Sequence, residues 1–184
     1  MAHSRDELEE MIDRYQACSD RCSETGDWSP MGDFYTEDAL YTWNTGAQWG
    51  FAARGPQQIV DWVMGTEMAG LEGWSYPYIR KLIDAEQDEC VGFWRQIAPD
   101  DDPATGTRYE IQGTGGSWFH YAGAFKWDWQ RDFFDHMNAG QTFLTMAKNG
   151  HLTPKMEERM SAGSDMPGWY RLDEFDWLDT LPGS

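Results

Sequence analysis

The sequence predicts an α+β domain in which helices cover one face of a curved, mostly antiparallel sheet. Helical periodicity dominates the first third of the chain, and four long strand candidates rich in aromatic residues then follow one another. Glycines inside one of these candidates, at Gly113, Gly115 and Gly116, indicate a bulge or bend of the kind that strong curvature requires. The remaining elements fit this arrangement in order.

The N-terminal part is predicted to be helical. In residues 5–25 apolar side chains recur every three or four positions, and acidic residues occupy the first turn. Ser29 is a good N-cap and Pro30 suits a first helical position, so a short second helix is expected to end near Tyr35. Residues 40–54 read as an aromatic hairpin, and a third helix is expected to begin at Gly55-Pro56 and to run to about residue 68.

The central part is predicted to be a meander of strands. The candidates span residues 76–84, 89–98, 108–121 and 124–136. Residues 85–88 and Ala122-Gly123 read as tight turns, whereas the polar segment 99–107 is expected to be a longer loop. These connections suit antiparallel neighbours, because antiparallel strands can be joined by short turns.

The C-terminal part changes character after His136. A helix is expected to end at Asn149-Gly150, and a short one to follow around residues 153–160. The last residues are irregular but contain several aromatic side chains among acids, so we expect them to cover a subunit interface or the mouth of a pocket. The chain is accordingly divided into a domain of residues 1–150 and a C-terminal extension of residues 151–184.

Composition excludes several function classes. The net charge of −18 would be repelled by nucleic acid or an anionic membrane, so neither is an expected partner. No apolar run reaches the roughly 18 residues of a membrane span, and the N-terminus does not resemble a signal peptide. The odd count of 3 cysteines and the lack of metal-ligand spacing predict reduced thiols in a cytoplasmic protein without a metal. Eleven tryptophans exceed what a core needs, so some are expected to line a cavity.

Several short motifs resemble one superfamily. Residues 34–39, FYTEDA, are similar to the "F-x-x-D-A" that ends the second helix of NTF2-like proteins, and GFAARG at 50–55 is similar to the stretch before their third helix. RDFFD at 131–135 resembles the "R-D-Y-F-D" of the last strand in SnoaL-like and limonene-epoxide-hydrolase-like members. The resemblance covers residues 5–150. It implies a cone-shaped, curved sheet that encloses an apolar cavity, and members that include dehydratases, cyclases, isomerases, epoxide hydrolases, lyases of lignin-derived diaryl compounds and non-catalytic binding modules.

The resemblance implies that Asp132 points into the cavity as an acid–base group. Strand alternation would then place Asp128, Gln130, Asp132, Phe134 and His136 on the inner face, and Trp127, Trp129, Arg131, Phe133 and Asp135 on the other. Desolvation in an apolar cavity raises a carboxyl pKa toward the range where it exchanges protons near neutrality. The alternative role is a structural ion pair with a neighbouring arginine.

The limonene-epoxide-hydrolase-like pattern fits only in part. Arg95 matches its arginine and Tyr41 its tyrosine, but Ile97 stands where a second catalytic acid is needed. The water-holding asparagine is replaced by Trp43, with Asn44 one step away. Plain epoxide hydrolysis is therefore disfavoured.

Other members of the superfamily suggest further candidates. Tyr15 lies where ketosteroid isomerases carry the tyrosine of their oxyanion hole, although their first-strand acid is missing near Trp43. Dehydratases pair a histidine with an acid, and His120 and His136 are the histidines on strand candidates. Each of these side chains has a structural alternative, as a packed tyrosine or a hydrogen-bonded histidine.

The resulting hypothesis is a lyase that needs no cofactor and eliminates water or formaldehyde from a small hydroxylated aromatic substrate. Asp132 moves the proton, Arg95 holds its charge or binds an oxyanion, and Tyr41, Tyr15 or His120 assists. A hydrolase or isomerase of the same fold and a non-catalytic binding module remain alternatives. The chain is also expected to form a homodimer or higher homo-oligomer through an aromatic patch at Trp127 and Trp129. The side chains expected to contact substrate are Trp43, Asn44, Trp94, Trp118, Gln130, Phe134 and His136.

Overall fold

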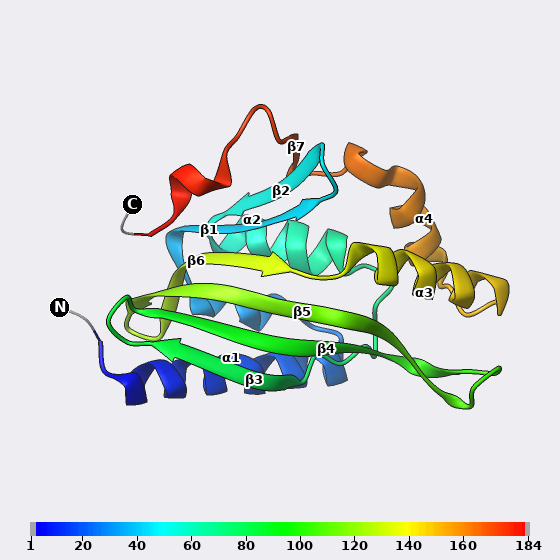
Figure 1. Ribbon diagram of the computed structural model, residues 1–184, viewed down its shortest axis with the longest axis horizontal. Helices are drawn as coiled ribbons and strands as arrows, with labels where there is room; N and C mark the ends of the chain where they lie inside the picture. The colour runs from blue at the N-terminus through cyan, green and yellow to red at the C-terminus, as the bar shows by residue number, and fades with distance from the viewer. Residues whose placement is uncertain (1–2, 183–184) are drawn as a thin grey trace.

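A curved, unclosed sheet of seven strands forms the centre of the computed structural model, which describes residues 3–182 (Figure 1). The strand order is β3-β4-β5-β6-β1-β2-β7, and all neighbours are antiparallel except β1 and β6, which are parallel. The predicted α+β class and curved, mostly antiparallel sheet are confirmed. The strands are β1 (Tyr35–Thr45), β2 (Trp49–Arg54), β3 (Tyr78–Asp84), β4 (Glu89–Asp102), β5 (Thr107–Gly123), β6 (Lys126–Phe133) and β7 (Trp169–Arg171).

Helices from the N-terminal third pack on the inner face of this sheet. Helix α1 (Arg5–Thr25) starts at Ser4, whose side chain accepts a hydrogen bond from the Glu7 amide, and it lies beneath β3 and β4 in Figure 1. Its apolar stripe is buried, as the three- and four-residue spacing predicts. The 3-10 helix η1 (Ser29–Phe34) follows. Helix α2 (Gly55–Gln58) continues as the π-helix η2 (Ile59–Glu67). π-Helices are rare overall, and those that occur often lie at functional sites.

The β4–β5 hairpin is longer than predicted. Residues 99–102 belong to β4 rather than to a loop, and Asp101 pairs with Arg108 and Asp102 with Thr107. The register shifts between Ile97 and Asp101, which admits Pro99 at an irregular position where no ladder hydrogen bond is lost. The polar composition of this segment indicated a loop. An exposed hairpin is held together by its backbone hydrogen bonds, so its strands can be polar on both faces.

A bulge in β6 changes which residues face inward. His120 pairs with Trp129 and Tyr121 with Trp127, so Asp128 is an extra residue between the two tryptophans. The strand alternation that was predicted across the whole segment therefore holds from Trp129 onward but is wrong for Asp128 and Trp127. Asp128 lies on the outer face, and Trp127 is fully buried against the inner core.

The segment after β6 packs on the rest of the chain. Helix α3 (His136–Lys148) is capped by Asp135, and α4 (Pro154–Ala162) and the short helix η3 (Gly163–Asp165) lead to β7, which pairs with β2. Helix η4 (Trp177–Thr180) then covers the outer face of the sheet. In Figure 1 this C-terminal segment runs in orange and red along the β2 side of the molecule.

The predicted oligomer patch is not a surface. Trp127 is 0% exposed and Trp129 is 3% exposed. The indole nitrogen of Trp129 donates to the Thr180 hydroxyl at 3.1 Å, and the guanidinium of the neighbouring Arg131 lies 3.8 Å from the centre of the Trp177 ring. Trp127 is therefore part of the inner core, and the chain's own C-terminal segment covers Trp129, so neither side chain is free to meet a second copy.

Within residues 3–182, no helix combines the length and apolar character that crossing a membrane requires.

Candidate active site

A cavity of about 590 Å³ lies between the inner face of the sheet and the surrounding helices. This volume falls in the range of small-molecule sites, about 300–1,000 Å³. Its wall is mostly aromatic and apolar, with few polar groups, and part of it comes from the C-terminal extension. The tryptophans that line it are Trp28, Trp43, Trp49, Trp74, Trp94 and Trp169.

Asp132 is a half-buried carboxyl that borders the cavity. The Tyr41 hydroxyl donates to Oδ2 at 2.5 Å, and the Gln130 amide donates to Oδ1 at 2.8 Å. The Ser117 hydroxyl, directly opposite in the β5–β6 ladder, is a further donor. Burial raises the pKa of Asp132, and these three donors oppose that rise because they stabilise the charged form. A carboxylate has about four acceptor positions, so three donors leave one for a ligand.

A hydrogen-bonded chain runs from Asp132 into the core. Tyr35 donates to the Gln130 side-chain oxygen at 2.6 Å, and the Tyr15 and Tyr35 hydroxyl oxygens are 2.8 Å apart. Because the Tyr35 proton is engaged with Gln130, Tyr15 is the donor between the two tyrosines. Burial raises the pKa of both hydroxyls, so both stay protonated at neutral pH. This chain fixes the Gln130 amide with its NH₂ toward Asp132.

Glycine makes room for the ring beside Asp132. A Cβ atom at Gly115 would lie 2.3 Å from the Trp94 ring, which covers this position on the neighbouring strand. The Trp94 indole nitrogen donates to the Ser117 oxygen at 2.9 Å. Ser117 thus accepts from Trp94 and donates to Asp132, so the glycine, the ring and the carboxyl form one unit.

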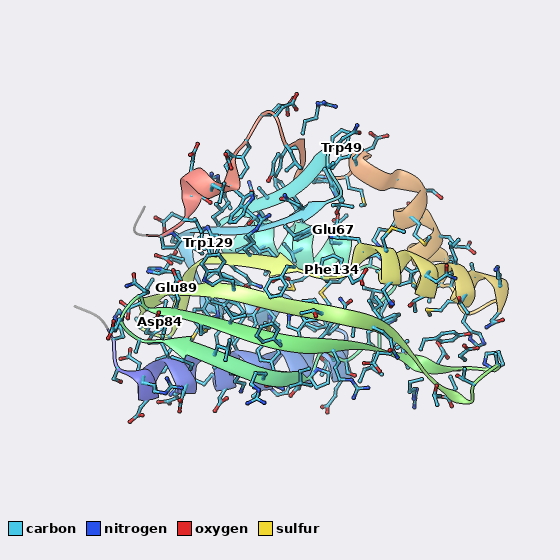
Figure 2. The ribbon with its side chains drawn as sticks, viewed as in Figure 1. Trp49, Glu67, Asp84, Glu89, Trp129 and Phe134 are labelled. Atoms are coloured by element: carbon cyan, nitrogen blue, oxygen red, sulfur yellow. The ribbon has the colours of Figure 1, made fainter. Side chains whose placement is uncertain are left out.

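His136 borders the cavity at the start of α3. Its ring lies 4.0 Å from the Phe134 ring, and Figure 2 labels Phe134 beyond the end of β6. Burial lowers the pKa of His136, so the imidazole is neutral at pH 7. The Trp43 ring stacks on the Phe51 ring with 3.8 Å between their centres. It also makes an edge-to-face contact with Tyr41 and borders the cavity.

A second polar group lies elsewhere in the cavity wall. Glu67, labelled in Figure 2 at the end of η2, accepts a hydrogen bond of 2.6 Å from the Trp169 indole. Arg159 of α4 donates to the Glu67 main-chain oxygen. Tyr76 and Gln96 also border the cavity. Burial raises the pKa of Glu67 and lowers that of Arg159.

Four candidates from the sequence do not border the cavity. Arg95 is 48% exposed and forms an ion pair with Glu110, so its predicted contact with Asp132 is absent. His120 binds Asp128 at 2.6 Å, and Trp118 donates to Glu89 at 3.0 Å, both on the outer face. Alternation along β4 and β5 explains these placements, because Trp94 and Phe119 take the inward positions beside them. Asn44 does not border the cavity either, although its chain neighbours Trp43 and Thr45 do.

The structure also brings together residues that the sequence did not single out. Ser117 and Tyr35 complete the network around Asp132, and Tyr78 borders the cavity with its ring over Gly92. The pairing of Ser117 with Asp132 could have been found by aligning the two strands of their hairpin. Glu67, Tyr76, Gln96 and Arg159 carried no such signal.

Among residues 3–182, no group of three or more His, Cys, Asp or Glu side chains is arranged to hold a metal ion. Cys18 and Cys22 are buried thiols with sulfur atoms 4.0 Å apart, and Cys90 is a buried thiol as well.

Comparison with known proteins identifies the fold. A protein from Jannaschia sp. CCS1 assigned as a SnoaL-like polyketide cyclase superposes with a TM-score of 0.57 at 13% identity, covering 77% of this chain and 96% of that one. An NTF2-like protein from Anabaena variabilis gives 0.55 at 18% identity, with 73% and 94% covered. TerC, crystallised with polyporic acid, gives 0.54 at 15% identity, with 74% and 98% covered. No protein-family model matches the sequence, and no curated protein matches it significantly. The chain shares the NTF2-like fold of these structures, the fold that the motifs predicted.

Proposed function

We propose that the protein is a cofactor-independent lyase that eliminates water or formaldehyde from a small hydroxylated aromatic compound. The observation that carries this proposal is the half-buried Asp132 carboxyl, held by Tyr41, Gln130 and Ser117 beside a cavity lined with tryptophan. A carboxyl with a raised pKa and a free acceptor position suits general acid–base catalysis.

Elimination of water needs one group that takes a proton and returns it. Ionised Asp132 removes a proton from the carbon next to the hydroxyl-bearing carbon, and the C–H electron pair forms the new C=C bond. The C–O bond breaks, and the departing oxygen takes the proton from the Asp132 carboxylic acid to leave as water. Neutral His136, which borders the same cavity, hydrogen-bonds the departing oxygen in this proposal.

Release of formaldehyde uses the same group on a different proton. Asp132 takes the proton of a CH₂OH hydroxyl, and the O–H pair becomes the C=O bond of formaldehyde. The C–C pair forms the C=C bond as a hydroxyl on the next carbon departs. That oxygen takes the proton back from Asp132, so the products are an alkene, formaldehyde and water.

The cavity supports an aromatic rather than an aliphatic substrate. Trp43 and Trp94 present rings close to Asp132, and Trp94 is fixed by its hydrogen bond to Ser117. Ring stacking favours flat ligands beyond the area they bury, by about 0.5–1.5 kcal/mol for each pair. The structural neighbour TerC was co-crystallised with polyporic acid, which supports a small-molecule ligand for this fold.

The alternatives differ in what they require. An epoxide hydrolase of the limonene type uses a second acid, and its position is held by Ile97, which does not border the cavity. A non-catalytic binding module would explain the cavity but would not need a carboxyl of raised pKa in its wall. An isomerase would share the proton transfer and differ in releasing nothing.

The test is turnover of aryl-substituted alcohols and 1,3-diols by Asp132→Asn. The native protein is expected to form a conjugated alkene, seen as new ultraviolet absorbance, with formaldehyde trapped in the diol case. Asp132→Asn is expected to lose about 10²–10⁴-fold in rate. The matched control is Asp128→Asn, which alters an acid on the outer face of the same strand and leaves the cavity intact.

Two outcomes would overturn the proposal. Unchanged turnover by Asp132→Asn would remove the carboxyl from the reaction. Incorporation of ¹⁸O from labelled water into the aryl-containing product would identify hydrolysis instead of elimination, whereas label in formaldehyde is disregarded because its carbonyl oxygen exchanges with water.

A further inference from the structure

We infer that Arg159 and Tyr76, with Gln96 beside them, form a second subsite in the cavity that binds a carboxylate group of the substrate. This inference rests on the proposed function, because it narrows the substrates of the proposed lyase to aromatic compounds that carry a carboxylate. One group of residues would hold the carboxylate, and Asp132 would act on the hydroxylated carbon chain at the other end.

Arg159 is the cation of the cavity wall among the described residues. It is half-buried on α4, and no carboxylate within residues 3–182 lies in ion-pair distance of it. Its recorded hydrogen bond goes to the main-chain oxygen of Glu67. A guanidinium carries five N–H donors in a planar fork that matches a carboxylate, so donors remain for a ligand.

Glu67 does not neutralise this arginine by direct contact. Its Oε1 atom is held by the Trp169 indole at 2.6 Å, and burial raises the pKa of the Glu67 carboxyl, although the indole hydrogen bond and the charge of Arg159 oppose that rise. The carboxyl thus serves the Trp169 indole, and the guanidinium remains a desolvated charge. Such a charge is costly unless an anion or several hydrogen bonds satisfy it.

Two further polar atoms in the cavity wall lack partners. The Tyr76 hydroxyl and the Gln96 side-chain oxygen are buried and make no hydrogen bond within the described part of the chain. Both residues border the cavity, and Tyr76 is close enough to Arg159 for each to influence the pKa of the other. The tyrosine can donate to a carboxylate, and the Gln96 side-chain oxygen can accept from a ring hydroxyl of the same ligand. Buried polar groups without partners are rare in native proteins, so a ligand is the simplest partner.

The subsite is separate from Asp132. Trp94 bonds Ser117 beside Asp132, and Gln96 is the next inward residue on β4, about 7 Å farther along the strand. Arg131, the neighbour of Asp132 in the chain, is the arginine whose charge lowers the pKa of that carboxyl.

The experiment compares biphenyl-4-carboxylate with biphenyl-4-carboxamide, which have the same shape and differ in charge. Binding is measured by isothermal titration calorimetry. The native protein is expected to bind the carboxylate at least about tenfold more tightly, because charge-assisted hydrogen bonds exceed neutral ones. Arg159→Met is expected to lose this preference and to keep its affinity for the carboxamide, and Tyr76→Phe to lose part of it. Lys155→Met is the matched control, since it removes an exposed cation of the same helix that pairs with Glu72.

The outcomes separate this inference from the proposed function. Equal binding of the two probes by the native protein overturns the subsite, and this comparison needs no variant to fold. An unchanged preference in folded Arg159→Met also overturns it. Carboxylate preference through Arg159 together with full turnover by Asp132→Asn would instead keep the subsite and overturn the lyase chemistry.

Discussion

The Tyr41 hydroxyl donates a 2.5 Å hydrogen bond to Oδ2 of Asp132, across the one parallel strand pair recorded in the described sheet. Tyr41 pairs in register with Gln130, which itself donates to the other oxygen of the same carboxyl. Both donors stabilise the ionised form of Asp132 and oppose the effect of burial. The balance between them sets the pH at which this carboxyl can accept a proton.

Tyr41→Phe is expected to move the pH dependence of the reaction. Loss of the donor raises the pKa of Asp132 further, so the acid limb of the kcat/KM profile should shift to higher pH and the rate at pH 6–7 should fall. A pH–rate profile measures this shift. Tyr121→Phe is the control, because its hydroxyl bonds Glu7 away from the cavity. An unshifted acid limb in Tyr41→Phe would contradict the assignment of that limb to Asp132.

Asp132→Asn is expected to change stability in a pH-dependent way. Because the folded state raises the pKa of Asp132, it binds this proton more tightly than the unfolded chain does. That stabilisation is complete below the unfolded pKa of about 3.9 and is lost as pH rises through the folded pKa. The free energy of unfolding of the variant, relative to native, should therefore increase between pH 4 and pH 8. Urea titrations at several pH values measure it, and a difference that is constant with pH would refute the buried charge.

The His120–Asp128 pair is expected to matter for stability and not for turnover. The hydrogen bond between the two side chains raises the pKa of His120 in the folded state. The resulting stability is present below the unfolded pKa of about 6.5 and is lost as pH rises through the folded pKa. Asp128→Asn should thus lower the free energy of unfolding at pH 6, by no more than about 1 kcal/mol for a partly exposed pair, and have less effect at pH 9. Turnover that falls with Asp128→Asn in a folded protein would return His120 to the list of catalytic candidates.

Gly115→Ala is expected to disturb the site through packing. The new Cβ atom would lie 2.3 Å from the Trp94 ring, so the ring must move and its hydrogen bond to Ser117 weakens. Overpacking of this kind costs about 1–3 kcal/mol, and turnover should fall as well. Thermal unfolding and Trp fluorescence measure both effects. Gly140→Ala is the control for stability, since a Cβ atom there meets nothing within 4 Å and alanine favours the helix.

Much of the fold could be predicted from local patterns. The α1 stripe, the Ser29-Pro30 helix start and the strand succession depend on residues near one another in sequence, and the structure reproduces them within a few residues. The motif at 131–135 likewise predicted Asp132 on the cavity side, where the structure shows it bonded to Tyr41 and Gln130. These predictions hold because periodicity and turn chemistry are local properties.

Two features were decided by tertiary structure. The bulge at Asp128 reversed the strand alternation on one side of it, and only the pairing with His120 and Tyr121 reveals where the extra residue sits. Arg95 was expected beside Asp132 but faces outward to Glu110, because β4 offers its inward positions to Trp94 and Gln96.

The sequence alone determined the fold class, the cavity and the acid in its wall. It could not determine that residues 151–182 return to the domain, where β7 joins β2, Trp177 covers Arg131, and α4 brings Arg159 to the cavity. These contacts join residues far apart in the chain, and they form by shape and charge complementarity between surfaces that exist only after folding. A periodic pattern reports which face of an element is buried, whereas the identity of the partner on that face is a property of the assembled structure.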